Sequence, residues 1–220
     1  MKRNRSDISA GLIVLISILN YATPVHAGRV AGSAHDFTTS GWSGGEICVA
    51  CHTPHSGDST QVAQLWNHSV TSTSFTMYSS PALDAISTGQ PGGISRLCLS
   101  CHDGTVGVDS FGGASGATFM SGTKVVGVGG NLSDDHPISI RFDSALALAD
   151  GSLHDPTTTT VTVGVAGSKT KTGTIEQLML VDGTVQCTSC HDVHNNFTAG
   201  DPLLRISTKG SQLCLSCHDK

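Results

Sequence analysis

The chain has 220 residues, enough for one or two domains, but it is poor in the large side chains that usually build a core. Aromatic residues make up only 5% of it, whereas 26 residues are glycine. The formal net charge of −5 disfavours binding to nucleic acids or to anionic lipid surfaces. We therefore expect no nucleic-acid partner, and we expect something other than apolar side chains to fill the interior.

Residues 1–27 have the features of a cleaved secretory signal peptide. A basic start precedes an apolar run from Ile8 to Leu19, and a small-residue cleavage pattern ends at Ala27. The alternative is a retained membrane anchor, but the apolar run is shorter than the roughly 20 residues that a membrane span needs. We expect an exported mature chain, 28–220, without a membrane span.

All eight cysteines belong to one repeated pattern, C-x-x-C-H, so none is left over for a separate disulfide framework. Two thiols three residues apart on a turn can add to the two vinyl groups at one haem edge, and the adjacent histidine then binds the iron. A zinc site would need neither the histidines nor four copies. The sequence predicts four covalently attached haem c groups, at Cys48, Cys51 and His52; Cys98, Cys101 and His102; Cys187, Cys190 and His191; and Cys214, Cys217 and His218.

The four units form two pairs, which indicates an internal duplication of a two-haem module. The first unit of each pair is followed three residues later by another histidine, His55 or His194. The second units are nearly identical, SRLCLSCHD and SQLCLSCHD. We place the modules at about 35–103 and 187–219, joined by an insert rich in glycine, serine and threonine at 104–186.

The remaining sequence predicts mostly irregular coil, with short helices and a few short strands wrapped around four stacked haems. Residues 104–130 are glycine-rich and aperiodic, which predicts coil. A capping aspartate and a terminal glycine predict a two-turn helix over 143–151. Residues 157–165 alternate β-branched side chains as a strand does, and Asp182-Gly183 predicts a hairpin turn before Cys187.

The second axial position of each iron decides the class of function. A protein ligand there favours electron transfer, whereas an open position favours small-molecule binding or catalysis. The expected mature chain has enough spare histidines for all four positions, and the six candidates are His35, His55, His68, His136, His154 and His194.

His55 follows His52 too closely to reach the opposite face of its own haem, so it is predicted to cap a neighbouring one. The natural neighbour is the haem of the second unit in the same module, at Cys98 and Cys101. The same reasoning assigns His194 to the haem at Cys214 and Cys217 and implies close haem pairs. For the two remaining irons the candidates are His35 and His136, with His68 in reserve.

Several segments resemble the doubled-CxxCH multihaem c-type cytochromes, and among them the OmcE-type tetrahaem cytochromes that form extracellular filaments in metal-reducing bacteria. They are AHDF, GEICVACHTPH, LWNHS, SRLCLSCHDGTV, DDHPIS, CTSCHDVH and LCLSCH. The resemblance implies four bis-histidine irons, a largely irregular fold and a continuous haem chain along the filament. It also implies that one axial histidine comes from the next subunit, for which His35 is our candidate because it lies before the first haem unit.

We therefore expect a subunit of an extracellular filament that conducts electrons from haem to haem without enzymatic turnover. Redox partners would act at either end. The alternatives are a soluble periplasmic tetrahaem shuttle and, less favoured, a haem reductase that needs an open iron.

Overall fold

A computed structural model describes residues 30–58, 63–86, 89–164, 169–197 and 203–219, most of which lie in coil and turns. The longest helix has 10 residues and the longest strands have 4. This agrees with the expected mixture of coil, short helices and short strands. The helices are α1 (Gly93–His102), α2 (Ser144–Asp150), α3 (Ile175–Met179), α4 (Cys187–Cys190) and α5 (Gln212–Leu215). Three 3₁₀ turns lie at Gly122–Lys124, Val128–Gly130 and Lys209–Ser211.

The strands form three sheets of two strands each within the described residues. They are β1 (Thr76–Met77) parallel to β2 (Asn131–Leu132), β3 (Ile140–Arg141) antiparallel to β6 (Thr184–Val185), and β4 (Thr160–Val163) antiparallel to β5 (Lys171–Thr174). Each sheet is too small to build a core alone. The strand pairs therefore connect neighbouring loops by backbone hydrogen bonds and do not form the core.

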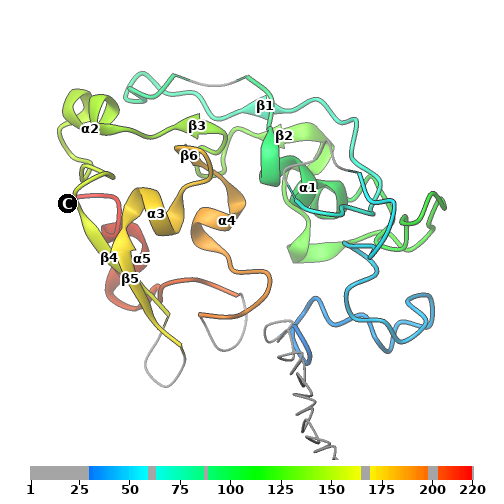
Figure 1. Ribbon diagram of the computed structural model, residues 1–220. Coiled ribbons are helices and arrows are strands. Elements are labelled where there is room, and N and C mark those ends of the chain that lie inside the picture. Colours follow the sequence, from blue (N-terminus) through cyan, green and yellow to red (C-terminus); the bar gives the residue numbers. More distant parts are fainter. Residues whose placement is uncertain (1–29, 59–62, 87–88, 165–168, 198–202, 220) are drawn as a thin grey trace, which may run out of the picture.

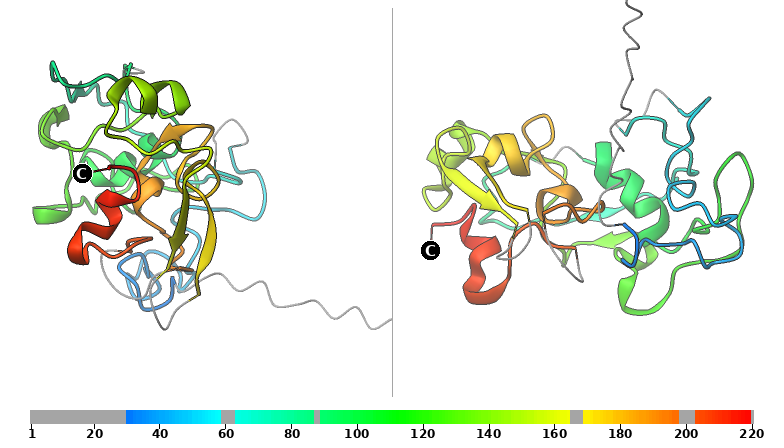
Figure 2. Two further views of the ribbon diagram at one scale, coloured as in Figure 1. Left: turned by 90° about the vertical axis from the view of Figure 1, so that its left-hand side faces the viewer. Right: turned by 60° about the horizontal axis from the view of Figure 1, so that its bottom comes forward.

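Helices α1 and α4 lie next to each other near the middle of the molecule (Figure 1). Figure 2 shows α3, α5, β4 and β5 gathered on one side of this pair, while the loops of the N-terminal half extend on the other. Helix α1 ends at His102, and α4 runs from Cys187 to Cys190. The centre of the fold is thus built from two of the C-x-x-C-H units.

Apolar side chains form two small cores. The larger joins α2, α3 and β4 and consists of Phe142, Ala147, Val161, Val163, Ile175, Met179 and Ile206. The smaller packs α1 against β2 and consists of Phe75, Leu99 and Leu132. Neither extends across the molecule, which fits the expectation that apolar side chains alone do not fill the interior.

The helix predicted over 143–151 is confirmed, together with its start and stop signals. The Asp143 carboxylate accepts a hydrogen bond from the Leu146 N–H, and Gly151 ends α2 with φ +68°. The predicted alternation is also confirmed over Thr160–Val163, where exposed threonines alternate with buried valines. Residues 165–168 lie outside the described part.

The turn at Asp182-Gly183 is confirmed, with φ of +50° and +70°, and Val181 and Thr184 pair across it, but the predicted hairpin extends no further. The segment before it forms α3, apart from a single bridge between Val181 and Thr184, and β6 pairs with β3 instead. Thr174 explains part of the difference, since its hydroxyl and Gln177 form a capping box that starts α3, and this helix includes Leu178 and Met179 of the expected strand.

The capping box at the start of α3 gives a local test of this part of the fold. Replacing Thr174 by alanine removes the acceptor for the Gln177 N–H, so we expect a loss of about 1 kcal/mol in the free energy of unfolding. Denaturant titration of the holoprotein measures it. The Thr174→Ser variant, which keeps the hydroxyl, should retain most of the stability; an equal loss in both variants would contradict the capping role.

The predicted signal peptide, 1–27, lies outside the described residues. Among the described residues, no helix is long and apolar enough to cross a membrane.

Candidate haem sites

Each C-x-x-C-H unit closes a single turn. In three units the histidine N–H donates to the carbonyl of the first cysteine, at 2.8 Å for His52, 3.0 Å for His191 and 3.0 Å for His218. In the remaining unit, Cys98, Cys101 and His102 complete the last turn of α1. A helical turn places residues three and four apart on one face, so both thiols and the histidine can approach one ligand together.

All eight cysteines are free thiols, and most are partly buried. Burial raises the pKa of Cys51 to about 11, and that of Cys101 and Cys217 to about 12. The surroundings of these three cysteines favour a neutral sulfur over a thiolate, whereas the contact with Cys98 lowers the pKa of Cys187 to about 7. A thioether is a neutral sulfur, so burial at Cys51, Cys101 and Cys217 is compatible with covalent haem attachment.

Three of the four motif histidines have another histidine ring beside them. Ring centres lie 6.1 Å apart for His35 and His102, 6.2 Å for His52 and His194, and 6.4 Å for His136 and His218. A metal–imidazole bond is about 2 Å long and the nitrogen lies about 1 Å from the ring centre, so two imidazoles on opposite sides of one iron have centres about 6 Å apart. The spacing of all three pairs fits a bis-histidine iron.

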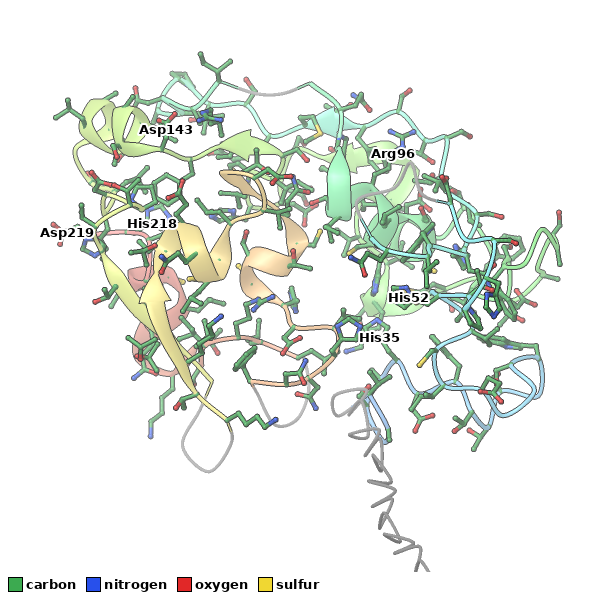
Figure 3. The ribbon with its side chains drawn as sticks, in the orientation of Figure 1. His35, His52, Arg96, Asp143, His218 and Asp219 are labelled. Carbon is green, nitrogen blue, oxygen red and sulfur yellow. The ribbon has the colours of Figure 1, made fainter. Side chains whose placement is uncertain are left out.

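The labelled histidines of these pairs lie in two places (Figure 3). In this view His35 and His52 are both drawn below α1, and His218 lies at the far side of the molecule, near the C-terminus. The histidine pairs are therefore distributed along the molecule rather than gathered in one pocket.

Hydrogen bonds at Nδ1 also leave the Nε2 atom of three of these rings available to bind a metal. The Nδ1 atoms of His52, His102 and His136 lie 2.8, 2.9 and 3.0 Å from the carbonyl oxygens of Gln64, Lys124 and Pro137. A carbonyl oxygen can only accept, so Nδ1 carries the proton and Nε2 keeps its lone pair. This second contact orients a ligating histidine and raises its basicity.

The pairs differ from those that the sequence predicted. His194 lies beside His52 instead of His218, and the ring beside His102 is His35 instead of His55. Distance along the chain was a poor guide, because segments far apart in the sequence fold against each other and bring these rings together. His136 lies beside His218, whereas the sequence assigned it to the iron at Cys48 and Cys51 or to that at Cys187 and Cys190.

The expectation that His35 serves the next subunit stays a prediction, and within the single chain its ring lies beside that of His102. The N-terminal arm folds back instead of extending. Asp36 accepts hydrogen bonds from Gly32 and Thr38, and the ring of Phe37 lies 5.1 Å from that of Trp42.

The reserve candidate, His68, is occupied by other contacts. It is buried, and its two ring nitrogens lie 2.7 and 2.9 Å from the carbonyl oxygens of Ser69 and Gly107. A neutral imidazole can donate only one of these two hydrogen bonds. The Nε2 atom of His68 also lies 3.4 Å from the Cys101 sulfur, so His68 lies next to the attachment site of Cys98 and Cys101 and stays a reserve candidate. His154 is tied to Cys217 through its backbone N–H, next to a motif whose histidine already lies beside His136.

A buried polar junction joins the C-x-x-C-H units of α1 and α4. The thiols of Cys98 and Cys187 interact, and this interaction raises the pKa of Cys98 well above its usual range and lowers that of Cys187 to about 7. The Ser95 hydroxyl accepts from the Cys187 N–H at 3.0 Å, and the Gln186 amide oxygen accepts from the Ser95 N–H at 3.0 Å. These contacts hold one attachment site of each module against the other.

The structure also reveals a duplication that is deeper than the sequence showed. Near each first unit, a segment 15 or 16 residues after the second cysteine returns to the motif with the same hydrogen bonds. The N–H of Asn67 donates to the Cys51 carbonyl, as that of Arg205 does to Cys190, each at 2.8–2.9 Å. Leu65 and Leu203 precede them with φ of +55° and +63°. The first leucine and the last serine that LWNHS and LLRIS share were the only sequence signals for this match.

Comparison with known proteins supports the nature of the site. The family model described as the doubled CXXCH motif matches residues 180–220, which include the third and fourth units. A search of curated proteins finds no match to the chain. The matched motif and the paired imidazoles support a multihaem c-type cytochrome that binds haem covalently and takes part in electron transfer.

Proposed function

We propose that this protein carries four haems, is secreted, and conducts electrons from haem to haem as a subunit of an extracellular filament. Three imidazole pairs with ring centres 6.1–6.4 Å apart carry the electron-transfer part of this proposal. When bound, haem supplies reversible one-electron reduction and oxidation. With a histidine on both sides of an iron, no position is open to a substrate, so we propose no enzymatic turnover.

The chain's own residues attach, ligate and hold the cofactors. Each pair of cysteines would fix one haem covalently, and the motif histidine would take one axial position. The second position would be taken by His194 opposite His52, by His35 opposite His102, and by His136 opposite His218.

For the iron of the Cys187 and Cys190 unit, we assign His55 as the second ligand. The other spare histidines already contact different motifs or backbone carbonyls, whereas His55 is exposed at the surface of the described chain. Its carbonyl accepts a hydrogen bond from the Thr53 hydroxyl at 2.9 Å, which holds the segment beside His52. An exposed ligand can reach an iron of a neighbouring subunit, which supports a filament.

The resemblance of the motif order to filament-forming cytochromes gives the second support for assembly. A test needs the secreted holoprotein alone. We expect four haems per chain by pyridine haemochrome assay, only low-spin ferric signals by electron paramagnetic resonance, and filaments in negative-stain micrographs. Monodisperse particles whose four irons stay low-spin at high dilution would favour the periplasmic shuttle, and a high-spin signal would contradict closed irons.

The His55→Ala variant tests the fourth ligand directly. We expect one of the four irons to become high-spin and the filaments to be lost. Trypsin places each unit on a separate peptide, because basic residues flank 30–96, 97–124, 172–205 and 210–220. Mild peroxide treatment should bleach the opened haem, so peptide 172–205 should lose its intact haem mass.

The His154→Ala variant is the matched control, since it removes a spare histidine that we do not assign to iron. It should keep four low-spin irons and all four haem peptides. Bleaching of peptide 97–124 in the His55→Ala variant would instead restore the assignment predicted from the sequence.

A further inference from the structure

The two matched segments differ in charge at one equivalent position. Asn67 and Arg205 both donate their backbone N–H to the second cysteine of a motif. Their side chains also make the same contact, because Asn67 donates to the Val49 carbonyl at 3.0 Å and Arg205 donates to the Thr188 carbonyl at 2.6 Å. One framework therefore carries a neutral amide in the first module and a guanidinium in the second.

The guanidinium of Arg205 lies close to the haem attachment site. Thr188, which accepts its Nε–H, stands between Cys187 and Cys190. The side chain is partly buried, and burial lowers its pKa, while the nearby Asp192 and Cys190 raise it. Because arginine stays protonated in proteins, a full positive charge sits beside the third unit.

Asp192 is the acidic residue closest in sequence to the unit of Cys187 and Cys190, and its carboxylate binds backbone N–H groups. It is buried and accepts hydrogen bonds from the backbone N–H groups of His194, Asn196 and Phe197. The equivalent residue in the first module is the neutral Thr53. The second module thus has a cation against the motif turn and an anion in the loop that follows it.

We infer that Arg205 raises the reduction potential of the haem attached at Cys187 and Cys190, an inference that rests on the proposed electron-transfer function. Reduction adds one electron to the ferric iron and lowers the positive charge of the site by one. A cation in a partly desolvated environment repels the ferric state more than the ferrous state. Asn67 exerts no such effect at the first unit, so two sites of equivalent geometry acquire different affinities for an electron.

The test is a spectroelectrochemical titration of the holoprotein carrying Arg205→Gln, Arg205→Lys or, at the equivalent position, Asn67→Arg. In Arg205→Gln we expect one of the four reduction potentials to fall by about 59 mV. For a one-electron couple, this shift corresponds to a tenfold decrease in the equilibrium constant of reduction. Arg205→Lys keeps the charge and should remain near the wild type. Asn67→Arg should raise a different potential.

The outcomes separate a charge effect from a structural one. Equal shifts in Arg205→Gln and Arg205→Lys would overturn the inference, because the change would then follow the lost hydrogen-bond geometry. Four unchanged potentials, or an upward shift, would overturn it as well. Failure of the proposed function is a distinct result, since it appears in the unsubstituted protein as missing haems or high-spin iron.

Discussion

Removal of the covalent haems is expected to unfold the protein. The two apolar cores contain seven and three buried residues, and each is confined to one part of the chain. Between them the backbone runs through coil and two-stranded sheets, which cannot offset the conformational entropy lost when a chain of this length is ordered. In the holoprotein, the apolar porphyrin faces would supply the missing buried surface.

This expectation is checked by producing the chain without haem attachment and comparing it with the holoprotein. The haem-free chain should give a poorly dispersed amide spectrum and no cooperative transition in denaturant, whereas the holoprotein should show both dispersion and a single sharp transition. A haem-free chain that unfolds cooperatively would show that the side-chain cores suffice. Addition of free haem without thioether formation serves as the control for non-specific binding.

Loss of the Gln186 side chain is expected to weaken the junction between α1 and α4. This side chain is 6% exposed, accepts from the Ser95 N–H and donates to the Thr184 hydroxyl, each at 3.0 Å. Gln186→Ala leaves the buried Ser95 N–H without its acceptor, which costs about 1–3 kcal/mol in the free energy of unfolding. The pair of attachment helices should therefore separate more easily than the rest of the fold.

Denaturant titration measures the global loss, and hydrogen exchange at the Ser95 amide reports the junction itself. The matched control is Gln177→Ala, since this exposed glutamine also accepts from a backbone N–H, that of Thr174, and its loss should cost only a few tenths of a kcal/mol. Unchanged protection at Ser95 in the Gln186→Ala variant would show that the junction is held by other contacts.

Local signals in the sequence were sufficient where the structure depends on neighbouring residues. Asp143 and Gly151 mark the two ends of α2, because a capping side chain and a left-handed glycine each act within one helical turn. Asp182-Gly183 makes its turn for the same reason. The C-x-x-C-H units were equally visible, since their chemistry lies within five consecutive residues.

Contacts between distant segments could not be predicted in the same way. Strands of two residues, such as β3 and β6, carry no periodicity, so their pairing follows from tertiary packing. The sequence predicted other histidine pairs than the structure shows for a related reason. The three residues from His191 to His194 determine where the ring of His194 lies relative to its own motif. They do not determine which other motif the fold brings next to that ring.

The interacting thiols of Cys98 and Cys187 have a consequence for the order of assembly. Two reduced thiols in such contact can give up two electrons and two protons to an oxidant and form a disulfide. That bond would take one sulfur from each of two attachment sites and leave both unable to hold haem by two thioethers. Haem attachment therefore competes with cross-linking wherever these two segments meet before they are loaded, so we expect haem to be attached at both units before α1 packs against α4.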